Sequence, residues 1–228
     1  MKISWHGQAC LQIETEKSRL IIDPYITDNP LSDLTVSDLQ VDYILLTHAH
    51  NDHIGDTEAI ARQNDATIIA NFEIATYFAN KGLKTHGMQP GGAYNFDFGK
   101  LFMTSAIHGS TYEESDGSLI TLGLAAGFVL EAEGKAIYHA GDTGLFYDMK
   151  LIGHSHQLDY AFLPIGDNFT MGPKEAAKAA RWIQANQVVP IHFNTFPLIN
   201  QNPEDFIQAL DDPRQGVILP IGKVLDLI

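Results

Sequence analysis

The chain has 228 residues and a mass of 25.1 kDa, with 45% hydrophobic and 18% charged residues. That is the composition of an ordinary globular protein, and it excludes disordered, collagen-like and coiled-coil chains. Lys and Arg number 14 against 28 Asp and Glu, a formal charge of −14. Neither a nucleic acid nor an anionic membrane surface is therefore an expected partner.

The length and the cysteine count bound the organisation further. We expect one domain over residues 1–228, long enough to bury a substantial core. Cys10 is the only cysteine, which excludes an intrachain disulfide and a thiolate metal cluster. The first residues lack the unbroken apolar stretch of a signal peptide, and no window approaches a membrane helix. A cytoplasmic protein is therefore expected.

The first half of the chain predicts strands with helices between them. The expected strands are residues 3–15, 19–22, 41–47 and 66–70. The expected helices are residues 54–63 and 73–81. The first two strands would form a hairpin, because polar residues interrupt the pattern between them. The strand, helix and strand that follow predict that part of the sheet is parallel.

The second half predicts antiparallel hairpins and then further strands and helices. The expected strands are residues 94–107 as a pair around Gly99, 125–140 as a pair around Gly134, 158–164, 188–193 and 217–227. The expected helices are residues 174–186 and 203–210. Both halves are rich in strands and both carry helices, so a two-sheet α+β sandwich with outer helices fits best.

The densest group of candidate ligands directly follows the strand expected over residues 41–47. It is the segment His48-Ala49-His50-Asn51-Asp52-His53. Alternate residues of an extended segment share one face, so His48 and His50 can reach the same point. A turn would then aim Asp52 and His53 at a second point nearby. Imidazoles and carboxylates are ligands of divalent metals, and a metal site is favoured over a solvated histidine-rich turn.

Four side chains cannot complete two metal sites, so further ligands are expected at later strand ends beside turn residues. Three residues meet that condition: His108, Asp142 and His192. Taken alone, His108 or His192 would be interpreted as a hydrogen-bonded core histidine. Each of the three follows an expected strand, however, and comes after the first motif.

The pattern His-x-His-x-Asp-His, a single His, an Asp in a Gly-Asp-Thr turn and a last His resembles the metallo-β-lactamase superfamily of dinuclear hydrolases. The resemblance covers nearly the whole chain. Within the superfamily, the chain is similar to a branch of metal-dependent hydrolases related to L-ascorbate-6-phosphate lactonase. The other segments that carry it are NFEIAT (71–76), YHAGDT (138–143), PIGDNFTMGP (164–173) and HFNTFP (192–197). The resemblance implies a four-layer αββα sandwich of two mixed sheets, with the site at one edge of both.

The resemblance also implies two divalent metal ions per chain, zinc first, with manganese, iron or nickel as alternatives. The implied ligands are His48, His50 and His108 for one ion and Asp52, His53 and His192 for the other, with Asp142 bridging both. Asp52 would also be catalytic, orienting a hydroxide shared by the two ions.

Other residues are expected near the site without binding metal. Asp23 matches an acidic residue that supports a ligand histidine in the family, although an Asp-Pro pair also starts turns. His6 lies where this branch has a histidine close to the site. In the loop over 166–173, Asn168 and Thr170 would line a substrate pocket. The alternative for that loop is a plain strand-to-helix turn with its apolar residues in the core.

These features imply a hydrolase acting on a small cytosolic metabolite, a lactone, a phosphodiester or a related ester. A metal-binding or sensing protein with the same fold and little turnover is the alternative. The chain contains no phosphate-binding loop, dinucleotide fingerprint or nucleophile elbow. The expected partner is a small-molecule substrate. A homo-oligomer is implied by the family branch only.

Overall fold

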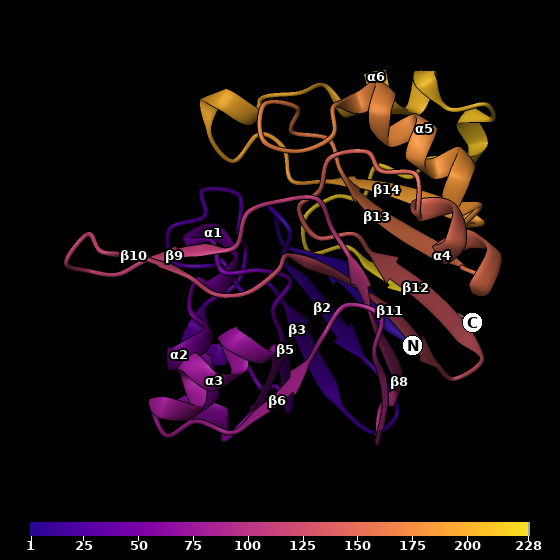
Figure 1. The fold of residues 1–228 in the computed structure, drawn as a ribbon. Coiled ribbons are helices and arrows are strands. Elements are labelled where there is room, and N and C mark those ends of the chain that lie inside the picture. Colours follow the sequence, from indigo (N-terminus) through magenta and orange to yellow (C-terminus); the bar gives the residue numbers. More distant parts are fainter. Residues whose placement is uncertain (228) are drawn as a thin grey trace.

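The computed structural model describes residues 1–227 as a sandwich of two β-sheets with helices on both outer faces (Figure 1). The first sheet has the order β15 (Val224–Asp226), β1 (Lys2–Trp5), β2 (Leu11–Glu14), β3 (Arg19–Ile22), β4 (Tyr43–Leu45), β5 (Thr67–Asn71) and β6 (Thr85–Met88). The second has the order β14 (Gln187–Ile191), β13 (Tyr160–Pro164), β12 (Lys135–His139), β11 (Ala126–Ala132), β8 (Gly99–Ser105) and β7 (Ala93–Phe96). Both sheets are mixed, and the expected α+β sandwich is confirmed.

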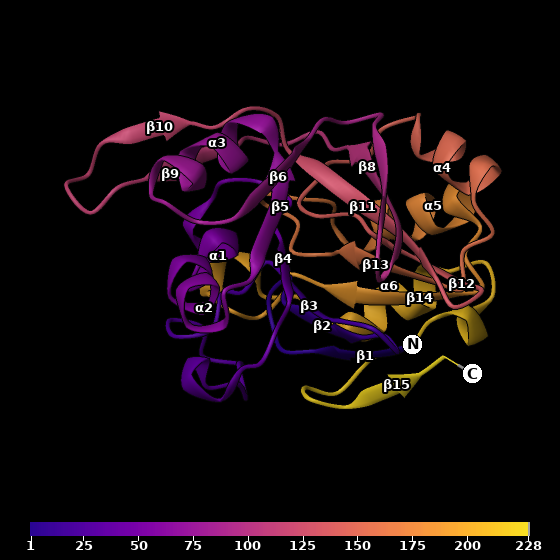
Figure 2. The same ribbon diagram turned by 90° about the horizontal axis from the view of Figure 1, so that it is seen from below.

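The helices form the two outer layers. Figure 2 shows one group beside β4 to β6 and another beyond the second sheet. The first group is α1 (Asn51–Ile54), α2 (Thr57–Asn64) and α3 (Phe72–Asn80), and the second is α4 (Met149–Ser155), α5 (Pro173–Ile183) and α6 (Pro203–Ala209). In α5, the buried residues Ala176, Ala179, Ala180 and Ile183 recur at helical spacing, so one stripe of the helix packs against the sheet.

Two hydrophobic clusters hold the layers together. The larger lies between the sheets and beneath α4 and α5, and it includes Leu11, Leu45, Phe128 and Phe162. The smaller joins the first sheet to α1, α2 and α3 through residues such as Ile44 and Phe78. Burying both faces of β4 explains its unbroken apolar sequence.

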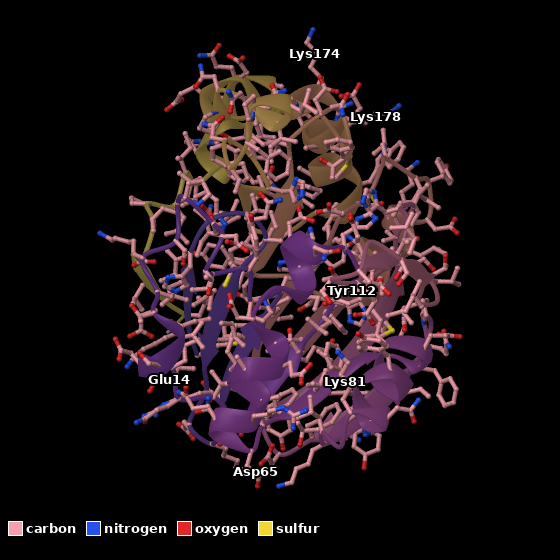
Figure 3. All side chains as sticks on the ribbon, turned by 90° about the vertical axis from the view of Figure 1, so that its left-hand side faces the viewer. Glu14, Asp65, Lys81, Tyr112, Lys174 and Lys178 are labelled. Carbon is pink, nitrogen blue, oxygen red and sulfur yellow. The ribbon has the colours of Figure 1, made fainter. Side chains whose placement is uncertain are left out.

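The separate hairpin of β9 (Thr111–Glu113) and β10 (Leu119–Thr121) projects from the body of the molecule (Figure 1). Tyr112, labelled in Figure 3, packs edge-to-face against Tyr77 of α3, with ring centroids 5.6 Å apart. The Tyr77 hydroxyl donates a hydrogen bond to Glu114. The base of the hairpin is therefore fixed to the first helical layer.

Most expected elements are present, and the predicted boundaries are wrong where glycines bend the chain. The three expected hairpins are antiparallel, and β4 and β5 pair in parallel around a helical crossover. The strand expected over 3–15 is instead β1 and β2, because Gly7 with φ +87° turns the chain between them. The helix expected over 54–63 begins at Asn51 and breaks at Gly55, whose φ is +41°. A side chain at Gly55 would collide with the Pro24 carbonyl.

Other differences concern short or irregular elements. In the segment expected as a strand over 217–227, only β15 is a strand. The sequence pattern misses β6, α4 and the projecting hairpin, because each is short and mostly polar or exposed. Among residues 1–227, no helix is both long and apolar enough to cross a membrane.

Cys10 is buried, and we expect it to be inert in the folded chain. Burial raises the pKa of its thiol well above the usual value, and the charge of Asp23 raises it further. The thiolate is the reactive form, so a disulfide-exchange reagent at pH 8 should label Cys10 about 100-fold more slowly than in urea, where unfolding exposes it. The checking measurement is the release of the chromophore over time. Equal rates in both conditions would contradict this burial.

Candidate metal centre

The predicted ligands lie at the ends of strands from both sheets. His48 and His50 follow β4, and Asp52 and His53 lie in α1 directly after them. The other three follow the second sheet's strands, His108 after β8, Asp142 after β12 and His192 after β14. These three strands run in the same direction. Both β8 and β12 are antiparallel to β11, and β12, β13 and β14 are parallel to one another. Their carboxyl ends therefore meet at one edge.

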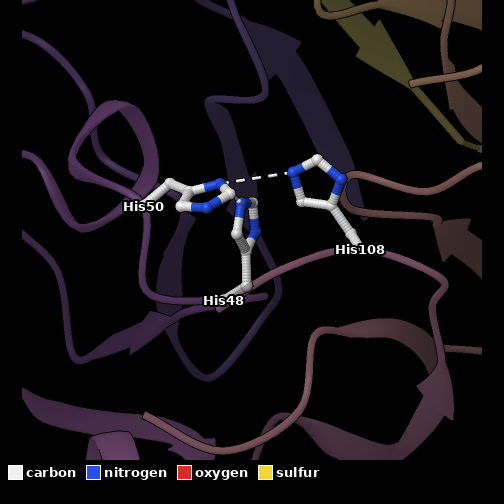
Figure 4. Close-up of side chains that lie close together, drawn as sticks. All are labelled: His48, His50 and His108. Atoms are coloured by element: carbon white, nitrogen blue, oxygen red, sulfur yellow. Dashed lines mark hydrogen bonds between the residues drawn. The ribbon is translucent and has the colours of Figure 1, made fainter. Parts of the chain in front are cut away.

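The first group of ligand atoms consists of three imidazole nitrogens (Figure 4). His50 Nδ1 lies 2.9 Å from His48 Nε2 and 3.2 Å from His108 Nε2. His48 and His50 present different ring nitrogens, although they are only two residues apart. Three nitrogens within 4.8 Å of one another can face a single divalent ion.

The second group combines a carboxylate with two imidazoles. Asp52 Oδ2 lies 3.6 Å from His53 Nε2 and 3.7 Å from His192 Nε2. The Oδ2 atom of Asp142 lies 2.9 Å from His192 Nε2 and 3.3 Å from His53 Nε2. The same oxygen is 3.5 Å from His108 Nε2, so Asp142 faces both groups.

The donor atoms fit a metal ion better than they fit one another. His53 Nε2 and Asp142 Oδ1 are buried and have no hydrogen-bond partner among the described residues. Buried polar atoms are nearly always satisfied, and leaving them unsatisfied is costly. Imidazole and carboxylate groups at these separations satisfy the chemistry of zinc or a similar transition metal.

The charges of the two groups differ. Burial lowers the pKa of His48, His50 and His108, with the neighbouring histidines adding to the effect, and leaves neutral imidazoles that are ready to bind metal. Burial also acts on His192, but Asp142 outweighs it and raises the pKa of His192 to about 9. At neutral pH, binding of a metal ion by His192 must therefore displace a proton.

Asp23 supports two of the candidate ligands through one hydrogen-bonded chain. Its Oδ2 accepts hydrogen bonds from the Thr47 hydroxyl at 2.7 Å and from His53 Nδ1 at 2.8 Å. The Thr47 hydroxyl in turn accepts from His48 Nδ1 at 2.9 Å. Both rings thus direct Nε2 toward the site. These contacts support the role that the family resemblance implies for Asp23, which stays a prediction, and they include His48 as well as His53.

We expect Asp23→Ala to lower metal affinity by about 10- to 100-fold, the usual effect of removing a hydrogen-bond partner of a ligand histidine. Competition with a chromogenic chelator measures this. Asp159→Ala is the control, because Asp159 also accepts a backbone N–H, from Ala136, but touches no candidate ligand. Equal affinities for the Asp23 variant and the unmodified chain would show that Asp23 only supports the turn.

His6 is held by two polar neighbours that are not candidate ligands. The imidazole is buried, with Nδ1 2.6 Å from Asp33 Oδ1 and Nε2 2.8 Å from Ser4 Oγ. Both ring nitrogens therefore have a polar partner. A place for His6 in the substrate pocket stays a prediction.

The loop over 166–173 is joined to the segment that carries Asp142. The N–H of Met171 donates to the Thr143 carbonyl at 2.9 Å, which ties the loop to the residue after Asp142. The Thr170 hydroxyl donates within the loop, to the Met171 carbonyl, and Asn168 is exposed. Met171 is buried, whereas Phe169 is 48% exposed. Contact of Asn168 and Thr170 with substrate stays a prediction.

Three further residues adjoin the centre that the sequence does not single out. Thr47 joins Asp23 to His48, as described above. Gln8 contacts Asp52 and His192, and Thr195 contacts Gln8. The pattern of residues 3–15 places Gln8 inside a strand, so nothing marks it as a site residue. The one local sign of a turn here is that Gly7 and the polar Gln8 interrupt the apolar pattern.

Comparisons with known proteins identify the family of the chain. Residues 18–193 match the family described as the beta-lactamase superfamily domain. The chain is 53% identical over 227 residues to a UPF0173 metal-dependent hydrolase from Anoxybacillus flavithermus and 54% identical to one from a Geobacillus strain, with 100% of each chain covered. The structure of Igni18, a metallo hydrolase from Ignicoccus hospitalis, is similar with a TM-score of 0.87 and 33% identity, over 98% of this chain and 97% of that one. The chain therefore belongs to the metallo-β-lactamase superfamily, among its metal-dependent hydrolases.

Proposed function

We propose that this chain is a dinuclear hydrolase acting on a small metabolite, a lactone, a phosphodiester or a related ester. The observation that carries the proposal is the position of Asp142, whose Oδ2 lies 3.5 Å from His108 and 2.9 Å from His192. One carboxylate oxygen thus faces both groups of ligand atoms. A protein that senses or stores a single ion needs no such bridge.

The two groups of side chains would each hold one ion. The first set is His48, His50 and His108, and the second is Asp52, His53 and His192, with Asp142 shared. Nitrogen-rich sites suit zinc, with manganese, iron or nickel as alternatives. When bound, divalent ions polarise the scissile group and lower the pKa of a water molecule from 15.7 to about 7.

Asp52 is the group that would handle the proton. Its side chain is 26% exposed, against 3% for Asp142, so it can reach an arriving substrate. Burial raises the pKa of Asp52, but the charges of His53 and His192 outweigh burial and hold it well below its usual range. An ionised Asp52 can accept a hydrogen bond from the attacking water and so orient it toward the scissile centre.

The surroundings of the centre favour a substrate with a negative or strongly polar group. The chain as a whole carries −14, which repels anions at long range. Two divalent ions would outweigh the charges of Asp52 and Asp142 and make the centre locally positive. A carboxylate, phosphate or ester carbonyl would therefore be drawn to this point of an otherwise acidic molecule.

The proposal is tested by purifying the chain without chelator, measuring its metal content and assaying it against a panel of lactones and phosphodiesters. We expect turnover of at least one class, its loss after treatment with a chelator and its recovery with zinc or manganese. Two bound ions with no turnover on any member of the panel would favour the metal-binding or sensing alternative. The cytoplasmic location, the homo-oligomer and the kinship with L-ascorbate-6-phosphate lactonase stay predictions.

A further inference from the structure

Gln8 is the polar residue most closely joined to the second ligand group without belonging to it. It lies in the loop between β1 and β2, is fully buried and has φ +49°. Its carbonyl accepts hydrogen bonds from the backbone N–H of His192 and from the indole N–H of Trp5, both at 2.9 Å. The backbone of Gln8 is thereby fixed to the end of β14, where His192 lies.

The side chain of Gln8 continues into the centre. Its Nε2 donates a hydrogen bond to Asp52 Oδ2 at 2.6 Å and lies 2.9 Å from His192 Nε2. At the other side of the amide, Oε1 accepts a hydrogen bond from the Thr195 hydroxyl at 2.5 Å. The opposite orientation of the amide would place two oxygens 2.6 Å apart beside Asp52, which is electrostatically unfavourable. The Asp52 carboxylate, which can only accept, thus selects which end of the amide faces it, and Thr195 holds the other end in place.

Asp52 needs such a partner more than the other ligands do. It lies in α1, a helix of four residues, and its side chain is the more exposed of the two carboxylates in the centre. The histidines around it act as ligands and cannot also direct an N–H at Asp52 once Nε2 binds an ion. Among residues 1–227, the Gln8 amide is then the hydrogen-bond donor that Asp52 Oδ2 retains.

We propose that Gln8 is a positioning residue, which holds the Asp52 carboxylate toward the second ion through its amide N–H, and that Thr195 holds the amide. This inference rests on the proposed function, because it concerns the site of the second ion. It predicts that replacing Gln8 lowers the affinity for that ion and leaves the affinity for the ion of His48, His50 and His108 unchanged. A hydrogen bond to an ionised carboxylate is stronger than one between neutral groups, so the effect is measurable.

The test compares Gln8→Met, Thr195→Val and the double variant with the unmodified chain. Methionine is close to glutamine in length but cannot donate a hydrogen bond. Gln12→Met is the control, because Gln12 lies on β2 at a cavity of about 250 Å³ formed by other residues of the first sheet. The measurements are zinc affinity at each site by chelator competition, the visible spectrum of the cobalt-loaded protein and the thermal midpoint without metal.

We expect Gln8→Met to lower the affinity for the second ion by about 10- to 100-fold and to change the cobalt spectrum of that site. The affinity for the first ion should not change. Thr195→Val should act in the same direction and more weakly. The double variant should be no worse than Gln8→Met, since both residues act through one contact. Gln12→Met should match the unmodified chain.

Two results would overturn the inference alone. One is an unmodified chain with two ions and a Gln8→Met variant with the same affinities and cobalt spectrum. The other is a loss of affinity shared equally by both ions together with a lowered thermal midpoint, which would make Gln8 a purely structural residue. If Gln8→Met does not fold, unchanged affinities and spectrum in Thr195→Val overturn it. An unmodified chain that binds no ion contradicts the proposed function, and this inference with it.

Discussion

Replacing His192 with alanine should remove one of two bound metal ions and lower turnover by on the order of 1,000-fold or more. His192 Nε2 lies 2.9 Å from Asp142 Oδ2 and 3.7 Å from Asp52 Oδ2, so its loss opens the second ligand group. Charge stabilisation by a metal ion contributes several kcal/mol to a transition state, and each 1.36 kcal/mol is tenfold in rate. Metal analysis and kinetics on the identified substrate provide the measurement.

His154→Ala is the matched control for this experiment. His154 is exposed on α4, away from the candidate ligands, and its removal should change neither metal content nor turnover. The His192 variant should still fold, because His192 directly follows β14 and its removal takes no large apolar side chain from the core. A His192→Ala protein with two ions and full activity would contradict the ligand assignment.

Asp52→Asn should retain at least one ion and lose turnover by about 100- to 10,000-fold, the range attributed to general acid–base catalysis. An asparagine oxygen can still face a metal ion, but the neutral amide carries no charge to hold the attacking water in a hydrogen bond. The measurement is kcat together with metal content, on the same substrate and over a range of pH.

An exposed acidic residue outside the centre provides the comparison. Asp148 precedes α4 without capping it, so Asp148→Asn should behave as the unmodified chain does. Normal turnover in Asp52→Asn with both ions bound would show that Asp52 does not orient the attacking water.

The candidate ligands are predictable from the sequence because four of them lie within six residues. His48, His50, Asp52 and His53 follow an apolar strand, and the geometry of an extended segment and a turn brings them together. His108, Asp142 and His192 are harder, since each is a single residue after a strand. Their grouping depends on strands that the structure shows to run in the same direction.

The partners of these ligands are less accessible to prediction. Gln8 and Thr195 are 187 residues apart in sequence, and nothing in their local patterns indicates that they meet. Residues 3–15 keep an apolar alternation through Ile3, Trp5, Leu11 and Ile13, all buried, so the loop that carries Gln8 is hidden within an apparent strand. The alternation persists because both strands face the same core.

The central claim is that Asp142 lies between two metal ions held by the two ligand groups. Anomalous diffraction from crystals of the zinc-loaded protein tests it most directly. We expect two anomalous peaks, one beside His48, His50 and His108 and the other beside Asp52, His53 and His192, with Asp142 contacting both. A single peak, or a second peak away from Asp142, would contradict the dinuclear centre.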